Sequence, residues 1–158
     1  MRIIVGADHA GFTLKQVLVD ALREWGHEVE DVGTHTGESV DFPIVARRVC
    51  DPLRAEKFER GVMVCGTGIG AAMAANKIPG IRAALCHDAY SAHQCVEHDD
   101  ANVLCLGAQI VGDKLARDLL RTFLDARMSD EEHFKCRVRQ LADLEREAAR
   151  ELQNAQQQ

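Results

Sequence analysis

Residues 61–76 read G-V-M-V-C-G-T-G-I-G-A-A-M-A-A-N, and this stretch decides the fold. Residues 62–64 form a short apolar run, which is typical of a strand buried inside a parallel sheet. Glycines at 66, 68 and 70 follow it, and the Ala- and Met-rich segment behind them has high helix propensity. The pattern therefore predicts a strand, a glycine loop and a helix.

The glycine loop predicts an anion site. Glycine permits positive φ and leaves room for a ligand against main-chain N–H groups, while an open helix N-terminus favours negative charge. Cys65 and Thr67 add a thiol and a hydroxyl to the same small space. A thiol at a helix N-terminus ionises more readily, so Cys65 is a candidate base or nucleophile. The alternative is a structural thiol buried at a strand end.

Length and composition indicate a single domain. The chain has 158 residues, of which 46% are hydrophobic and 28% charged, and its apolar runs are too short to span a bilayer. No secretory signal precedes the first strand pattern, so we expect a soluble cytoplasmic protein. The net charge of −6 without a Lys/Arg cluster argues against nucleic-acid or membrane binding. An anionic substrate would need individually placed arginines and histidines.

Six cysteines raise the question of disulfides or a metal. None forms C-x-x-C and none has zinc-finger spacing to a histidine, so reduced, mostly buried thiols are expected rather than a metal site. The cysteines are Cys50, Cys65, Cys86, Cys95, Cys105 and Cys136.

Strand and helix patterns alternate along the chain. Strands are expected at 2–7, 28–32, 62–64, 81–86 and 103–106, with the second near a sheet edge. Helices are expected at 13–25, from 43 to 53 or beyond with a break or kink at Pro52, after the glycine loop up to 79–80, at 89–97, over 115–124, and from 129–131 to 152. The domain is expected to cover 1–152, and 153–158 to be a frayed tail.

This alternation predicts a single-domain α/β/α sandwich with a five-stranded parallel, doubly wound, Rossmann-like sheet. Ligands bind beyond the carboxyl ends of such strands. Asp8 and His9, residues 65–67, His87 and Asp88 follow strands, and we expect them to converge on one rim with the loop that carries His98.

The loop can be compared with the sequence motifs of several known binding sites and reactions. G-T-G-I-G lacks the spacing of a dinucleotide fingerprint, and no Lys-Ser/Thr pair follows as in a Walker loop. No H-E-x-x-H or facial carboxylate pattern supports a metal-assisted hydride shift. Cys65 with His9 or His98 leaves thiol-based acyl or phosphoryl transfer open. Asp8 and His9 could equally be a helix cap and a surface histidine, and His98 and Arg137 solvated side chains.

Five motifs together resemble the ribose-5-phosphate isomerase B family, which includes allose- and galactose-6-phosphate isomerases. They are G-A-D-H-A-G-F-x-L-K at 6–15, D-F-P at 41–43, C-G-T-G-I-G with A-A-N-K at 65–77, G-I-R-A at 80–83 and E-H-D-D-A-N-V-L at 97–104. The resemblance covers nearly the whole chain. It implies a homodimer or tetramer with the C-terminal helix at the dimer interface and active sites shared between subunits. It also implies cofactor-free, metal-free interconversion of aldose and ketose phosphates through a cis-enediolate.

The resemblance also implies site residues. Cys65 would be the base, since Ala71 stands where some relatives have a glutamate. His98 with Asp8 would open the sugar ring, and His9 and Arg137 would meet the phosphate. The developing oxyanion would be held by the loop residues Gly66, Thr67, Gly68, Ile69 and Gly70.

Four positions depart from the common family pattern and bear on the substrate. Gln109 and His133 stand where arginines are frequent, Phe42 replaces a frequent tyrosine and Asp99 a frequent asparagine. Gln109, His133 and Asp99 are still expected to line the substrate site. Ribose 5-phosphate is the expected substrate, with a tetrose 4-phosphate, a hexose 6-phosphate or an unphosphorylated sugar as alternatives. A thiol-dependent transferase and a sugar-phosphate-binding subunit without turnover also remain open.

Overall fold

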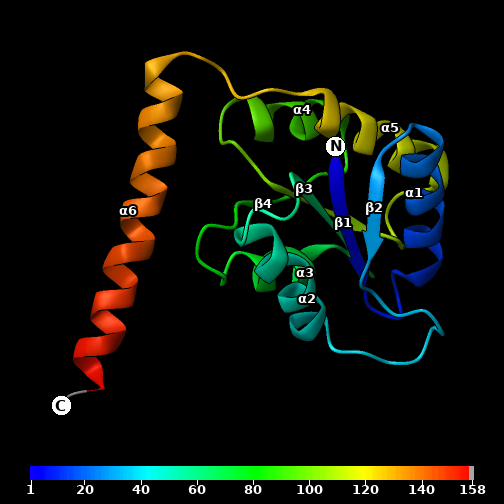
Figure 1. Cartoon of the computed structure of the whole chain (residues 1–158), viewed down its shortest axis with the longest axis horizontal. Helices are drawn as coiled ribbons and strands as arrows, with labels where there is room; N and C mark the ends of the chain where they lie inside the picture. Colours follow the sequence, from blue (N-terminus) through cyan, green and yellow to red (C-terminus); the bar gives the residue numbers. More distant parts are fainter. Residues whose placement is uncertain (157–158) are drawn as a thin grey trace.

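Five parallel strands form the centre of the molecule (Figure 1). The computed structural model describes residues 1–156. Its strands are β1 (Arg2–Ala7), β2 (Glu28–Asp31), β3 (Arg60–Cys65), β4 (Ala83–Leu85) and β5 (Val103–Gly107), in the order β2-β1-β3-β5-β4. The sequence-based expectation of a parallel sheet with the second strand at an edge is confirmed. Burial matches position, because β3 and β5 are almost wholly buried while β2 is half exposed.

Helices cover both faces of the sheet (Figure 1). Helices α1 (Phe12–Glu24), α4 (Ala89–Glu97) and α5 (Asp113–Asp125) pack on one face in one hydrophobic cluster, whose largest member is Phe123. Helices α2 (Phe42–Arg54) and α3 (Ile69–Ala75) pack on the other face. Successive side chains of a strand point to opposite faces, so Val62 and Val64 join the first cluster and Met63 and Cys65 the second.

The segment between α3 and β4 differs from its expected structure. The helix ends at Ala75 instead of 79–80, and the strand begins at Ala83 instead of Ile81. The Arg82 N–H donates to Asn102 Oδ1 at 2.9 Å instead of to a strand partner. On the open side of β4, the Asn76 amide accepts from the Ala83 N–H at 2.8 Å and donates to the Ala83 carbonyl at 2.9 Å. It therefore takes the place of a neighbouring strand. Pro52, in contrast, lies inside the last turns of α2, which continues to Arg54.

The last helix, α6 (Glu132–Ala155), extends away from the sandwich as an arm (Figure 1). Its 24 residues include no buried one. It touches the body where Phe134 stacks on His98 and where Glu145 accepts the Gly80 N–H at 2.9 Å. The helix includes residues 153–155, the first three of the expected frayed tail, and residues 157–158 of that tail lie outside the described residues.

The apolar stripe expected along 134–152 has no partner surface in this chain that buries it. Leu141, Leu144 and Leu152 on α6 remain 45%, 60% and 67% exposed. Such an exposed stripe is typical of a surface that packs against another molecule. Across residues 1–156, none of the helices combines the length and the apolar character needed to cross a membrane.

Candidate functional site

Cys65 lies at the carboxyl end of β3, with its sulfur turned into the glycine loop. The thiol is 5% exposed, and the backbone N–H of Gly68 donates to its Sγ at 3.1 Å. The buried strand thus delivers the sulfur to the start of α3, where main-chain N–H groups point outward. Thr67, between the two residues, is exposed, and its hydroxyl accepts from the Ile69 N–H at 3.4 Å. The sequence-based grouping of thiol, hydroxyl and backbone donors is therefore present.

Two glycines make this arrangement possible. Gly68 has φ +79°, and a Cβ there would lie 2.4 Å from the Leu85 side chain. Gly107, at the end of β5, would place a Cβ 2.6 Å from the Thr67 carbonyl. Any larger residue at either position would push the loop away from β4 or β5. The loop is consequently held against the sheet by backbone contacts.

Asp8 lies beside Cys65, directly after the neighbouring strand β1. Ala7 pairs with Val64, so Asp8 and Cys65 are the next residues on adjacent parallel strands. Asp8 is 8% exposed, and its Oδ1 accepts the Gly11 N–H at 3.0 Å. His9, next in the chain, is exposed. The structure therefore brings Asp8 and His9 to the same rim as the thiol, as expected.

Gln109 and His87 border the loop on its other side. The Gln109 N–H donates to the Gly66 carbonyl at 2.9 Å, and its side-chain oxygen would be 3.3 Å from a Cβ on Gly66. His87 Nε2 accepts a hydrogen bond from the Gly107 N–H at 3.1 Å. His87 therefore helps to fix the end of β5, against which the loop packs. Sequence reasoning placed His87 at this rim and gave it no role. Its position directly after a strand was the available signal.

Phe42 covers the far end of the loop. A Cβ on Gly70 would meet the Phe42 ring at 3.2 Å, and the ring remains 39% exposed. Ala71 behind it is buried, so no side-chain carboxylate competes with the thiol from that position. Phe42 follows the long segment 32–41, whose start is held by an internal ion pair.

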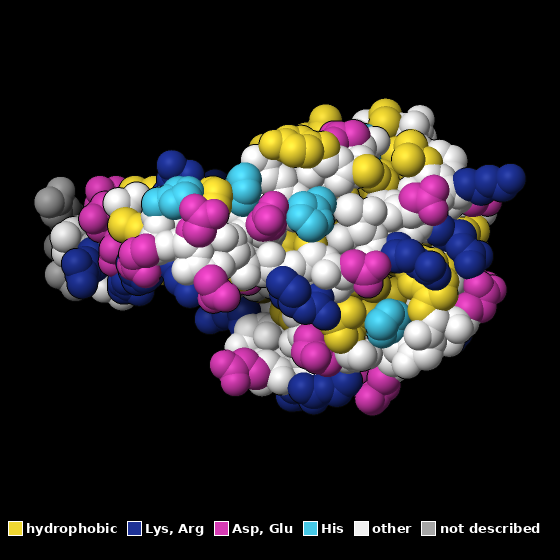
Figure 2. Space-filling view, turned by 90° about the horizontal axis from the view of Figure 1, so that it is seen from above, with side chains coloured by type: hydrophobic (Ala, Val, Ile, Leu, Met, Phe, Trp, Pro, Cys, Tyr) yellow, Lys and Arg dark blue, Asp and Glu magenta, His cyan; other side chains and the backbone are white. Residues whose placement is uncertain are grey.

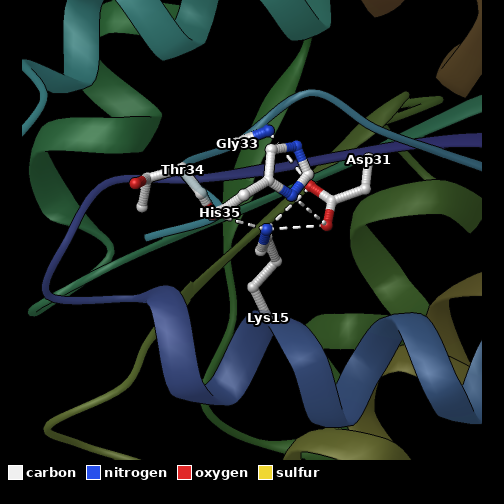
Figure 3. Close-up of polar contacts among 5 residues, drawn as sticks. All are labelled: Lys15, Asp31, Gly33, Thr34 and His35. Atoms are coloured by element: carbon white, nitrogen blue, oxygen red, sulfur yellow. Dashed lines mark hydrogen bonds and ion pairs between the residues drawn. The ribbon is translucent and has the colours of Figure 1, made fainter. Parts of the chain in front are cut away.

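That ion pair joins α1 to the end of β2 (Figure 3). Lys15 is fully buried, and its Nζ donates to both carboxylate oxygens of Asp31 at 2.7 and 2.8 Å and to the Thr34 carbonyl at 2.8 Å. Gly33 lies against Ala7, with a hypothetical Cβ only 2.5 Å from the Ala7 nitrogen. Lys15 thus anchors the start of the segment that ends at Phe42. Sequence reasoning missed this anchor, because a lysine on an apolar helix face gives no local sign of its partner.

A second polar group of residues gathers around Phe134, where the arm joins the body. The ring of His98 stacks on Phe134 with centroids 3.9 Å apart, and His133 lies against the same ring at 3.9 Å. The Arg137 guanidinium is 5.7 Å from the ring centre. His98 also pairs its Nδ1 with the Gln94 amide at 2.9 Å. Histidine side chains are visible at this junction in Figure 2. We call Phe134, His98, His133 and Arg137 the Phe134 cluster.

The Phe134 cluster and Cys65 lie at opposite ends of the parallel strands. His98 ends α4 and precedes β5, whose first residue Val103 pairs with Gly61 at the start of β3. Cys65 pairs with Gly107, at the far end of the same two strands. Asp99, next to His98, is exposed at the same edge as that histidine. The expectation that His98 shares a rim with Cys65 is therefore wrong within one chain, because a loop before a parallel strand lies at its amino end.

We call Cys65, Thr67, Asp8 and the N–H groups of the glycine loop the thiol rim. These groups suit proton transfer next to a carbonyl. A sulfur that can carry a proton, a carboxylate and convergent N–H groups lie there without an adjacent imidazole bonded to the sulfur. Among residues 1–156, no cluster of three His, Cys, Asp or Glu is arranged to hold a metal ion. The rim residues described above include no lysine or arginine, whereas the Phe134 cluster contains Arg137.

Known proteins resemble this chain over most of its length. Residues 3–141 match the ribose/galactose isomerase family. The ribose-5-P isomerase B of Listeria innocua is 43% identical over 129 residues, covering 82% of this chain and 87% of that protein. The D-erythrulose-4-phosphate isomerase of Pectobacterium atrosepticum is 41% identical over 127 residues, covering 80% and 84%.

A solved structure shows the same fold. Ribose-5-phosphate isomerase B of Clostridium thermocellum superposes with a TM-score of 0.91 at 42% identity, covering 94% of this chain and 99% of that one. The parallel sheet and the matched length thus agree with one family. This chain belongs to the ribose/galactose isomerase family and is a sugar-phosphate isomerase.

Proposed function

We propose that this chain interconverts ribose 5-phosphate and ribulose 5-phosphate without a cofactor, using Cys65 as the base. The observation that carries the proposal is the position of the Cys65 sulfur, which faces the Gly68 N–H at the end of β3 with Asp8 on the adjacent strand. The family and its ribose-5-phosphate isomerase B relatives support the reaction type.

The reaction consists of two proton transfers on the open-chain sugar. Cys65 removes the proton from C2, and the electron pair moves onto the C1 carbonyl oxygen to give a cis-enediolate. The same sulfur then returns a proton to C1, while the proton of the C2 hydroxyl passes to the C1 oxygen, which leaves a carbonyl at C2 and a hydroxyl at C1. Thr67 and the N–H groups of residues 66–70 hold the negative oxygen between these steps. Each well-placed donor of this kind contributes about 3 kcal/mol to lowering the barrier.

Two copies of the chain complete the site. The thiol rim supplies base and oxyanion donors, whereas His98, His133 and Arg137 belong to the opposite edge and to the arm. In a homodimer the two copies pack so that the Phe134 cluster of one copy, at the base of its arm, lies over the thiol rim of the other. The arm's exposed stripe of Leu141, Leu144 and Leu152 supports this arrangement. His98 with Asp8 then opens the ring, and Arg137 with His9 binds the phosphate.

A different sugar phosphate is the alternative substrate. The resemblance to the ribose-5-phosphate isomerase B family implies arginines at the positions of Gln109 and His133, so fewer permanent cations face the phosphate here. A relative at 41% identity is named D-erythrulose-4-phosphate isomerase. A panel of tetrose, pentose and hexose phosphates compared by kcat/KM tests the assignment. The ribose 5-phosphate proposal requires the highest value for that sugar, and a higher value for a tetrose 4-phosphate overturns it.

The panel should be run in deuterated water. An enediolate route exchanges the C2 proton with solvent, and product deuteration measured by NMR is the expected result. A thiol transferase would instead show a covalent adduct on Cys65 by mass spectrometry and no deuterium at carbon. Thermal stabilisation by the sugar phosphate without any turnover would indicate a binding subunit.

A further inference from the structure

Cys86 and Cys95 form a pair of thiols outside the proposed reaction. Their sulfurs are 3.9 Å apart, although neither is in a C-x-x-C motif. Cys86 follows β4 and precedes α4, whereas Cys95 lies in the last turns of α4, so the fold brings them together through the docking of that helix. Both residues are free cysteines.

The two thiols differ in access to small molecules. Cys86 is 2% exposed, while Cys95 is half-buried and lines a cavity of about 380 Å³ between the body and α6. Arg82, Leu141 and Leu144 line the same cavity. A small polar oxidant entering the cavity would meet Cys95 first, with Cys86 directly behind it.

Their surroundings also make their acidities unequal. The hydrogen bond that Cys86 donates lowers the pKa of Cys95, and the Arg60 guanidinium acts in the same direction against burial and Asp99. The same bond and burial raise the pKa of Cys86. The thiolate is the nucleophilic form, so Cys95 is the attacking thiol and Cys86 the resolving one.

We infer that Cys86 and Cys95 are an oxidation site at which hydrogen peroxide closes an intrachain disulfide. The Cys95 thiolate attacks one peroxide oxygen, the O–O bond breaks, and the departing hydroxide takes a proton to leave as water. The Cys86 sulfur then attacks the sulfenic sulfur of Cys95, the S–O bond breaks, and a second water leaves with the Cys86 proton. Two thiols are oxidised to one disulfide and one peroxide is reduced to two waters.

Two other buried thiols are poor competitors for this chemistry. Burial raises the pKa of Cys50 to about 12 and raises that of Cys105 strongly. Cys65 is expected to react with peroxide as well, which would also stop turnover, so activity cannot report on the pair. The disulfide itself must therefore be measured, and this makes the test independent of the proposed isomerase reaction.

Peptide mapping tests the inference. The folded full-length chain is treated with hydrogen peroxide, the remaining thiols are blocked with iodoacetamide, and the chain is digested with trypsin, Glu-C protease and chymotrypsin. Cleavage after Arg82, Tyr90 and Glu97 separates the two cysteines onto different fragments, 83–90 and 91–97. They stay joined only through a disulfide.

In the native chain we expect the two fragments as one linked species that separates on reduction. Cys95→Ser and Cys86→Ser should abolish this species, and the matched control Cys136→Ser should retain it. Non-reducing electrophoresis should show the oxidised chain at monomer mass. The inference is overturned if the linked species is absent, if Cys95 is joined to Cys105 or to a second chain, or if Cys95 is converted to sulfinic acid while Cys86 stays a thiol.

Discussion

The proposed catalytic groups lie at the two ends of the parallel strands, the carboxyl edge and the amino edge of the sheet, and the fold holds them differently at each. At the carboxyl edge, Cys65 and Asp8 are almost buried and bonded to backbone N–H groups of the same body. At the amino edge, His98, His133 and Arg137 surround Phe134 on a helix that buries none of its own residues. The first edge is preorganised by the fold, whereas the second becomes a site only when something packs against it.

Replacing Cys65, the proposed base at the carboxyl edge, should lower kcat more than any other single change. Cys65→Ala removes the group that carries the proton in both steps, so kcat should fall about 10³-fold or more. Steady-state turnover of ribose 5-phosphate measures it, with a circular-dichroism melt to show that the variant is folded. Cys50→Ala is the matched control, a buried thiol without a role in the reaction, and should keep near-native turnover. Equal losses in both variants would remove the proposed role of Cys65.

A complementation experiment tests whether the two edges meet between chains. His98→Ala should lower turnover about 10²-fold, because ring opening loses its proton carrier. Co-expressing it with Cys65→Ala under two tags gives mixed dimers in which one of the two sites has both residues. An equal mixture should then recover about a quarter of native turnover, since about half of the pairs are mixed.

The control for that experiment is the pair placed in one chain. A chain carrying both Cys65→Ala and His98→Ala, co-expressed in equal amount with the native chain, should leave about a quarter of native turnover, because neither site of a mixed dimer then has both residues. If purified mixed dimers of the two single variants stay inactive, both halves of each site come from the same chain, and the shared-site arrangement is wrong.

Lys15→Met should show that the carboxyl edge depends on its internal anchor. The change leaves the Asp31 carboxylate and the Thr34 carbonyl without their buried partner, which destabilises the fold by about 3 kcal/mol. Urea unfolding measures it. Arg146→Met is the control, since Arg146 is an exposed residue of α6 whose pairing with Asp143 is solvent-screened. A loss below about 1 kcal/mol for Lys15→Met would mean that segment 32–41 is held by other contacts.

An arginine at position 133 should produce the smallest effect, and it tests whether the amino edge binds the substrate phosphate. His133→Arg adds a permanent charge beside Arg137, so KM for ribose 5-phosphate should fall several-fold with kcat little changed. Gln109→Arg makes the same change from the thiol rim and provides the comparison. An unchanged KM in both variants would indicate that the substrate phosphate binds away from these positions.

Much of the body could be predicted because its determinants are local. An apolar run followed by spaced glycines and a helix-forming segment specifies strand, loop and helix at 61–76, and β1 and α4 have the bounds expected from their own patterns. The thiol, hydroxyl and N–H groups of the loop are neighbours in sequence, so their grouping followed from the same pattern. The start of β4 was missed because the Ile81 N–H closes a turn with the Ile78 carbonyl and the Arg82 N–H bonds the Asn102 side chain, twenty positions later.

Tertiary structure alone decided which groups face each other across the molecule. The Lys15–Asp31 ion pair and the Cys86–Cys95 contact each depend on how a helix docks on the sheet, which no local periodicity encodes. His98 is placed at the amino edge because its helix returns the chain to the start of β5. The sequence thus determined the body and the chemistry of its loop, and the packing of distant segments decided that the cationic residues lie at the other end of the sheet.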